Sequence, residues 1–244
     1  MDRKAYLMAA AVEDDHWWYR GRRAVLRAVL NRFVSPRTTP LGILEVGCGN
    51  GGNLPWLSEY GVLHAVKQDD EARHRAALRG IGVVEAGWLP DGLPFGSRTF
   101  DVIAALDVLE HVQDDRRALE ALAARLRPGG LLVVTVPASP WLWSHRDDLS
   151  HHRRRYTRSQ LVAAASHAGL HVTYSTYFNT FLFPLAVAEI STGWLTNRCP
   201  ETALQIPPYG LNRLFAAAFA LESAFLPTLS FPCGLSILMC ATAP

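Results

Sequence analysis

A glycine-rich turn is the feature of this sequence that most directly predicts chemistry. It spans residues 47–52, reads GCGNGG and follows the apolar run 41–46. In such a turn the backbone passes close beside a bound ligand, and a Cβ at the glycine positions would block that approach. The turn therefore predicts a ligand site. Its spacing through Gly47, Gly49 and Gly52 also fits the G-x-G-x-x-G pattern of dinucleotide-binding proteins.

Histidines follow two later apolar runs. His111 comes after residues 100–106, and His145 and His152 come after residues 131–136. Because the carboxyl ends of parallel strands share one edge of a sheet, these three side chains are the candidate catalytic bases. The histidines after the second run have no cysteine or acidic partner at a recognisable ligand spacing, so no metal site is expected.

The elements that must position these residues follow a regular pattern. Apolar runs alternate with helical segments, which predicts an α/β fold with a doubly wound, mostly parallel, seven-stranded sheet. The strands are expected at residues 41–46, 62–66, 82–85, 100–106, 131–136, 171–178 and 235–242.

Helices are expected between these strands, with their ends marked by capping residues. Asn53 and Asp69 are predicted to cap the first two helices, and Thr157 or Ser159 begins the last one. The helix over 114–126 is expected to end before Pro128-Gly129-Gly130, and glycines at 61, 80 and 169 to end the others.

The rest of the chain flanks this core. Residues 1–40 are predicted to be an N-terminal helical lid, since apolar side chains from 25 to 33 are spaced for one buried face. The core covers residues 41–178. An apolar helical insertion is expected over 179–233, and residues 234–244 hold the final strand. The insertion could form a tunnel, a dimer face or a membrane-resting surface.

Composition excludes several classes of protein. The 244 residues are 49% hydrophobic with a formal net charge of +2, which excludes disorder and a strongly basic nucleic-acid binder. No run of about 18 apolar residues predicts a membrane span. Four cysteines without a C-x-x-C pair, and no secretory leader, favour the cytoplasm. Only Lys4 and Lys67 are lysines among 24 basic residues, so a lysine is unusual here.

Several segments together carry a family resemblance. ILEVGCGNGG at 43–52, LPF at 93–95, LEHV at 109–112 and LRPGG at 126–130 occur in order. Over residues 41–178 the sequence resembles the class I S-adenosylmethionine-dependent methyltransferases of the small-molecule type. The Trp-Trp-Tyr block and His-Arg-Arg-Arg-Tyr resemble a bacterial subgroup of uncharacterised members. The resemblance implies a Rossmann-like methyltransferase fold, an enzyme, and S-adenosylmethionine as its cofactor.

The same resemblance assigns the cofactor-binding residues. Glu45 and the glycines of the turn would face the methionine and ribose portions, and Trp88 would either stack on the adenine or be a core aromatic. The full predicted set is Glu45, Gly47, Cys48, Gly49, Gly51, Lys67, Gln68, Trp88, Leu89 and Asp107.

Lys67 departs from the family pattern. The second strand of the family normally ends in an acid that accepts hydrogen bonds from both ribose hydroxyls, whereas a lysine can only donate. Asp69 or Asp70 could reach the ribose after a register shift, or the protein could bind S-adenosylmethionine weakly or not at all. A basic residue here could also accommodate the 2′-phosphate of NADP.

The acceptor site is predicted on the side of the fourth and fifth strand ends. Aromatic residues could wall an apolar pocket there, and the basic run 152–156 could hold an anion or be a solvated turn. The residues predicted to bind the acceptor are Trp17, Trp18, Tyr19, Trp141, Arg154 and Tyr156.

Three functions therefore follow from the sequence. The first is methylation of an apolar, anionic small molecule or lipid-like metabolite. The second is a methyltransferase-fold binding module or non-methylating enzyme, and the third is an NADP-dependent oxidoreductase. No nucleic-acid partner is expected, and the sequence leaves open a homodimer and a membrane-surface contact through 179–233.

Overall fold

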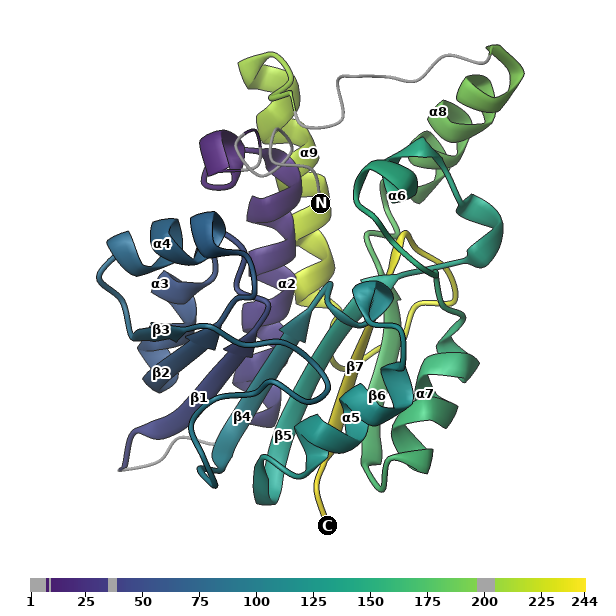
Figure 1. Cartoon of the computed structure of the whole chain (residues 1–244). Coiled ribbons are helices and arrows are strands. Elements are labelled where there is room, and N and C mark those ends of the chain that lie inside the picture. The colour runs from purple at the N-terminus through teal and green to yellow at the C-terminus, as the bar shows by residue number, and fades with distance from the viewer. Residues whose placement is uncertain (1–7, 9, 35–38, 197–204) are drawn as a thin grey trace.

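A seven-stranded sheet forms the centre of the molecule (Figure 1). The computed structural model describes residues 8, 10–34, 39–196 and 205–244; the remainder, parts of the predicted lid and insertion with Cys199 among them, lies outside the described residues. Across the sheet the order is β3-β2-β1-β4-β5-β7-β6, and only β7 runs antiparallel to its neighbours. The strands are β1 (Leu41–Val46), β2 (Gly61–Val66), β3 (Val83–Glu85), β4 (Phe100–Leu106), β5 (Leu126–Pro137), β6 (His171–Phe178) and β7 (Ser236–Thr242).

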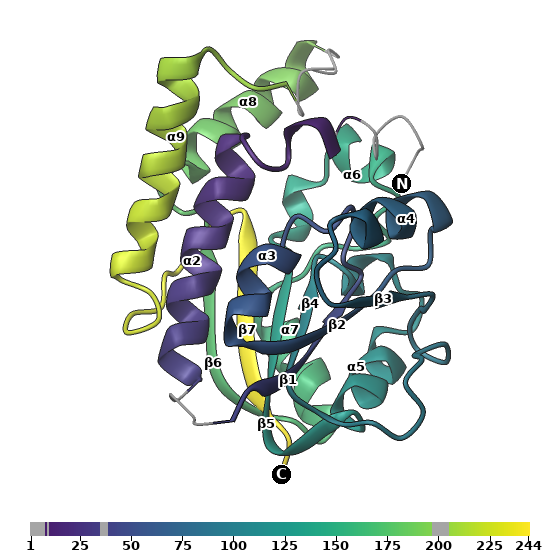
Figure 2. The same ribbon diagram turned by 90° about the vertical axis from the view of Figure 1, so that its left-hand side faces the viewer.

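Helices cover both faces of this sheet, as the side view shows (Figure 2). One face carries α2 (Trp17–Phe33), α3 (Leu54–Leu57) and α9 (Tyr209–Leu221), and the other carries α5 (Asp115–Ala123) and α7 (Arg158–His167). Beyond the carboxyl ends of the parallel strands lie α6 (His145–Leu149) and α8 (Phe183–Thr196), while α4 (Asp70–Leu78) follows β2.

Each face of the sheet has its own apolar core because successive strand side chains point to opposite faces. In β1, Ile43 packs with Val25 and Leu26 of α2, whereas Leu44 packs in the cluster that contains Leu119 of α5. A strand that is buried on both faces consists almost entirely of apolar residues. For this reason the strands could be predicted from the apolar runs in the sequence.

The predicted fold class is confirmed, with two local corrections. Asn53 does not cap α3: its amide donates to Glu45 Oε1 at 2.8 Å and its oxygen accepts from the indole of Trp56. The LRPGG segment, predicted to close a helix, belongs to β5, since Leu126 pairs with Phe100 of β4. Asp69 and Thr157 cap α4 and α7 as expected.

The first part of α2 is held by α9, which belongs to the segment predicted as an insertion. Gly21 faces Phe219, and a Cβ built on Gly21 would lie 2.5 Å from that ring. The amide N–H of Trp17 donates to Asn212 Oδ1 at 2.8 Å, and the Asn212 side chain donates to the carbonyl of Asp15 at 2.9 Å. The two helices thus pack in direct backbone-to-ring contact.

Within the part of the chain that the structure describes, no helix is both long enough and apolar enough to cross a bilayer.

We expect Gly21→Ala to lower the free energy of unfolding by about 1–3 kcal/mol, because the added methyl overpacks the α2–α9 contact. Thermal and urea unfolding would measure the change. Gly210→Ala is the matched control, since a Cβ there meets nothing within 4 Å; it should be neutral or slightly stabilising. Equal stability of the two variants would contradict the proposed contact.

Candidate functional site

A hollow of about 1970 Å³ lies at the carboxyl ends of the parallel strands. This is the edge at which α/β sheets bind ligands. Its walls come from the glycine turn after β1, the segments after β2 and β3, the turns after β4 and β5, and parts of α2, α6, α8 and α9. Segments far apart in sequence therefore meet around one space.

The glycine turn forms the wall beside β1 and β2. The amides of Gly47 and Cys48 both donate to the carbonyl of Val66, at 2.9 and 3.1 Å. Gly49 has a φ of +57°, and a Cβ built on it would meet nothing within 4 Å. Because Gly49 lines the hollow, the backbone there leaves a cradle that a side chain would enter.

Gly51 has a different role from the one predicted. It is absent from the cavity lining, and a Cβ on it would lie 2.9–3.1 Å from Arg79, Leu54 and Ala76. The positive φ of +89° and the missing side chain allow the turn to pack closely against Leu54 of α3 and Ala76 of α4. Gly51 therefore shapes the turn from behind.

Glu45, also predicted to face the cofactor, is fully buried in β1 and is not part of the cavity wall. One carboxylate oxygen accepts the Asn53 amide, while Oε2 has no hydrogen-bond partner. Burial outweighs the Asn53 hydrogen bond and raises the pKa of Glu45 to about 7. The side chain braces the turn through Asn53.

Lys67 and Gln68, which the sequence predicts to bind the cofactor, line the hollow directly after β2. The Lys67 amide donates to the carbonyl of Glu85, which aligns the ends of β2 and β3. The Asp69 carboxylate accepts from the amide of Ala72 at 2.8 Å as the helix cap, so one of its oxygens is committed to α4.

Further along this wall, Trp88 and Leu89 also line the cavity. Trp88 is 51% exposed, which removes the alternative of a core aromatic and leaves its ring accessible to a ligand. Asp70, the other acid considered for the ribose, is paired with Arg73 and is not part of the lining.

A partly buried ion pair joins α2 to the end of β4. The guanidinium of Arg22 lies 2.7 Å from the Asp107 carboxylate and donates to the hydroxyl of Thr135 at 2.9 Å. That hydroxyl in turn donates to Asp107 Oδ1 and accepts the Asp107 amide. Arg22 belongs to the cavity wall, and its Nε atom is buried without a hydrogen-bond partner.

Sequence reasoning missed Arg22. It is four residues after Trp18 and three before Val25, on the stripe of α2 that faces the core. A charged residue on an apolar helix face is the signal that could have revealed it, because buried arginines are almost always paired.

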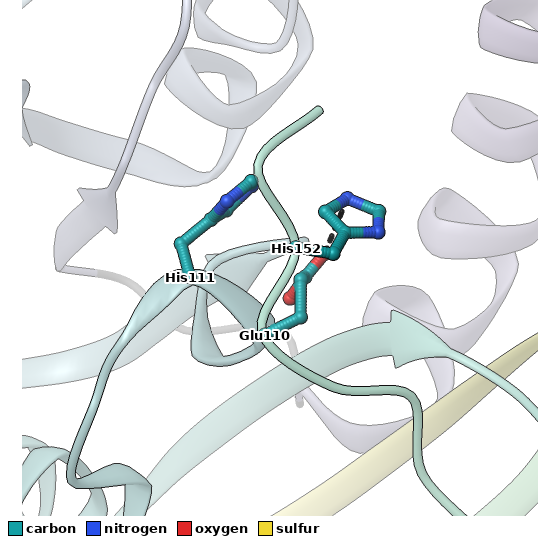
Figure 3. Close-up of side chains that lie close together, drawn as sticks. All are labelled: Glu110, His111 and His152. Carbon is teal, nitrogen blue, oxygen red and sulfur yellow. Dashed lines mark ion pairs between the residues drawn. The ribbon is translucent and has the colours of Figure 1, made fainter. Parts of the chain in front are cut away.

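The acidic and histidine side chains after β4 and α6 form a compact group (Figure 3). Glu110 and His111 lie in the short turn η2 (Leu109–His111), and His152 arrives from the loop before α7. The rings of His111 and His152 are 5.0 Å apart, and His152 Nε2 lies 3.9 Å from Glu110 Oε1. All three line the hollow.

Burial controls the charge of this group. It raises the pKa of Glu110 well above its ordinary value, with the Asp107 charge adding to the effect. Burial and the neighbouring His152 lower the pKa of His111 to about 4, so His111 is neutral at pH 7. Hydrogen bonds from His152 and Arg155 outweigh burial at Asp147 and lower its pKa to about 2.

The aromatic residues of α2 that are predicted to bind the acceptor line the hollow, whereas other residues predicted to bind it do not. Trp17, Trp18 and Tyr19 are part of the wall, and the Arg22 guanidinium lies 5.0 Å from the Trp18 ring centroid. Trp141 is 57% exposed and packs edge-on against Phe183 of α8, outside the cavity lining.

The basic run is turned toward the protein. Arg154 donates to the carbonyls of Val112 and Gln113, and Tyr156 is buried with its hydroxyl on Asp115 at 2.8 Å. Neither lines the hollow, because both hold the start of α5. His145 does line it, from the first residue of α6.

The other two arginines are also engaged. Arg155 binds Asp147 and the carbonyl of Ala138, and Arg153 donates to the carbonyl of His111 while still lining the hollow. The run therefore ties the loop before α7 to the ends of β4 and β5.

Comparisons with known proteins agree with this architecture. A family model described as a methyltransferase domain matches residues 17–175. The ubiquinone biosynthesis O-methyltransferase of Parvibaculum lavamentivorans is 32% identical over 101 residues, which are 39% of this chain and 40% of that protein. The chain thus spans about two fifths of the length of this curated relative.

Solved structures share the fold. The [4+2]-cyclase SpnF superposes with a TM-score of 0.62 at 17% identity, covering 99% of this chain and 92% of that one. The N-methyltransferase NodS of Bradyrhizobium japonicum, in complex with S-adenosylhomocysteine, gives a TM-score of 0.53 at 20% identity, covering 67% and 81%.

The sheet order and the glycine turn at its carboxyl edge define a Rossmann-like protein with a nucleotide-type ligand site. The match over residues 17–175 places the chain more closely: it belongs to the methyltransferase-domain family of class I S-adenosylmethionine-dependent proteins. The residues present fit that cofactor, because Gly49 leaves a cradle in the cavity wall and Arg22 places a positive charge in the same wall.

Glu45→Gln tests whether the pKa of Glu45 is raised in the folded protein. The folded-state pKa of Glu45 lies above its ordinary value, so the folded state holds the proton longer and stability falls as pH rises from about 4.5 to about 7. One such group changes the free energy of unfolding by at most about 1.4 kcal/mol per pH unit. In urea unfolding across this window, the variant should lose that part of the slope.

Glu120→Gln, on the exposed side of α5, is the control and should leave the slope unchanged. A Glu45→Gln variant with the same pH slope as the unaltered protein would show that the Glu45 carboxyl is already ionised in the folded state.

Proposed function

We propose that this protein transfers the methyl group of S-adenosylmethionine to a hydroxyl oxygen of an apolar small molecule. The observation that carries the proposal is a cavity with a glycine cradle at one end and an aromatic wall beside polar side chains at the other. The similarity to an O-methyltransferase of ubiquinone biosynthesis supports the choice of a hydroxyl.

The donor half of the site would be held by backbone and buried charge. When bound, S-adenosylmethionine supplies an electrophilic methyl group on a sulfonium sulfur. The turn at Gly47 and Gly49 would give the backbone approach, and the positive charge of Arg22 in the cavity wall would attract the carboxylate. Trp88 offers its exposed ring for stacking.

The acceptor half of the site combines apolar and polar walls. Trp17, Trp18, Leu182, Leu185 and Phe215 line the hollow. They would exclude water from a hydrophobic body and orient it, which is most of what an in-line displacement requires.

At the polar end of the acceptor site, a hydrogen bond to Asp147 orients the ring of His152. Asp147 accepts His152 Nδ1–H at 2.8 Å, so Nε2 can accept a hydroxyl proton. Because Arg154 and Arg155 bind protein groups, the proposal does not extend to an anionic acceptor.

A second candidate function is a reaction other than methyl transfer in the same fold. Two observations favour it: SpnF, a [4+2]-cyclase, shares the fold, and Lys67 replaces the acceptor expected for the ribose. If the protein does not bind S-adenosylmethionine, this second candidate is supported. If it binds NADPH alone, the oxidoreductase alternative is supported.

The proposal predicts donor binding and an organic-soluble product. Calorimetry should show S-adenosylhomocysteine binding, and methyl-labelled S-adenosylmethionine incubated with extracted metabolites should give label in the organic phase. Gly49→Ala should abolish both, because the methyl enters the cradle. Label confined to the aqueous phase would contradict the apolar acceptor.

Gly80→Ala is the matched control for this experiment. Gly80 also has a positive φ, +66°, with nothing within 4 Å of a built Cβ, but it lies outside the cavity lining. Both variants carry similar backbone strain of about 1–2 kcal/mol, so only Gly49→Ala should lose the ligand. Equal losses would assign the effect to strain.

Lys67→Glu should tighten S-adenosylhomocysteine binding by about 10- to 100-fold, because a carboxylate restores an acceptor for the ribose hydroxyls. Gln68→Glu adds the same charge one position later and should give little gain. Weaker binding by Lys67→Glu would mean that the lysine itself contacts the ligand. Calorimetric titration measures each affinity.

A further inference from the structure

Glu110, His111 and His152 bring three ligand-type atoms together: one carboxylate oxygen and two ring nitrogens lie within 4.8 Å of one another (Figure 3). Spacing in the sequence gave no sign of this, since His152 is contributed by a loop that follows β5 and α6. The backbone of the two segments is tied together, because the Arg153 amide donates to the carbonyl of Glu110 at 2.8 Å.

Both imidazoles are held by their Nδ1 atoms. His152 Nδ1 lies 2.8 Å from Asp147 Oδ1, and His111 Nδ1 lies 3.4 Å from the carbonyl of His151. With Nδ1 donating to these acceptors, each ring keeps its Nε2 lone pair for another partner. A carboxylate or carbonyl behind a histidine is the arrangement that orients metal-binding imidazoles in proteins.

Asp147 is itself fixed for this role. Its carboxylate is 1% exposed, accepts from Arg155 Nε at 2.8 Å and from the Ser144 amide at 2.9 Å. The support behind His152 is therefore a buried, fully engaged hydrogen-bond network. Such support gives a ring a single orientation before any ion arrives.

Glu110 supplies the independent sign of a missing ligand. The residue is completely buried, and neither carboxylate oxygen has a hydrogen-bond partner. A buried polar group without a partner costs several kcal/mol in a low-dielectric environment, so native proteins pair such groups or coordinate metals with them. The side chain points to His152, where a cation would satisfy it (Figure 3).

We propose that Glu110, His111 and His152 bind a divalent first-row transition-metal ion in the cavity wall. Two imidazoles with one carboxylate form a three-ligand set that leaves coordination positions open, as in catalytic zinc and iron sites. Imidazole donors favour zinc, copper, iron or nickel over magnesium, calcium and manganese. Tetrahedral ligand atoms at about 2.0–2.2 Å from a metal lie about 3.4 Å apart, so atoms that are now up to 4.8 Å apart would approach by up to about 1.4 Å on binding.

The role of this metal site in the reaction rests on the proposed methyl transfer to a hydroxyl group. All three side chains line the hollow, so the open positions would face the acceptor. A hydroxylated acceptor is the chemical class that would coordinate there, since a metal-bound hydroxyl loses its proton more readily. In that state the histidine lone pairs hold the metal, and the proton leaves to solvent.

The test is metal binding by the full chain after chelator treatment, without donor or acceptor. Zn²⁺ and Co²⁺ should bind one ion per chain by calorimetry and raise the Tm, whereas Mg²⁺ should bind far more weakly. His111→Ala and His152→Ala should each lose at least about 100-fold in affinity, and Asp147→Asn about 10- to 100-fold. His167→Ala, at an exposed position near the end of α7, is the control and should bind the metal normally.

Glu110→Gln separates metal loss from misfolding. Because the unaltered carboxylate has no partner, the amide variant should keep its Tm without metal and lose the Tm increase that Zn²⁺ causes. Equal Zn²⁺ affinity in His111→Ala, His152→Ala and the unaltered protein would overturn the site. Metal binding without any donor binding would instead refute methyl transfer and leave the site standing.

Discussion

Arg22 and Asp107 meet at 2.7 Å where α2 crosses the carboxyl edge of the sheet, and most of the cavity depends on that pair. Thr135 closes the network with hydrogen bonds to both partners. An arginine buried this deeply cannot remain unpaired, and removing Asp107 would leave its charge uncompensated. The pair therefore sets the position of α2 over the sheet.

Two walls of the cavity follow from that position. On one side, α2 presents Trp17 and Trp18 to the hollow, and the Gly21–Phe219 contact holds α9 beside it. On the other side, Asp107 has a φ of +57°, a left-handed conformation that turns the chain sharply after β4. That turn leads into η2, where Glu110 and His111 point into the same space.

A second charged network closes the cavity from the side of β5. Asp147 receives His152, Arg155 and the Ser144 amide, so the loop between α6 and α7 is drawn back onto the sheet edge. The basic run thus works as a structural fastening: arginine forks bind fixed backbone and carboxylate acceptors as readily as they bind a ligand. Arg154 and Arg155 thus use their charge on groups of the protein, whereas Arg153 also lines the cavity.

The sequence by itself determined the features that depend on neighbouring residues. Alternation of apolar strands with helices specified the sheet, and Asp69 and Thr157 specified helix starts, because a cap acts within three residues. The glycine turn could also be predicted from the sequence. The positive φ angles at Gly47 and Gly49 favour glycine, so the turn appears as a run of glycines.

Only the tertiary structure decided which side chains meet. Asn53 does not cap α3, because its side chain donates to Glu45 of β1 instead. The LRPGG segment is part of β5, because Leu126 pairs with Phe100 of β4. His152 reached Glu110 and His111 through a loop whose path depends on Asp147. Spacing along the chain carries no information on such contacts, because packing and buried charge pair residues that are distant in sequence.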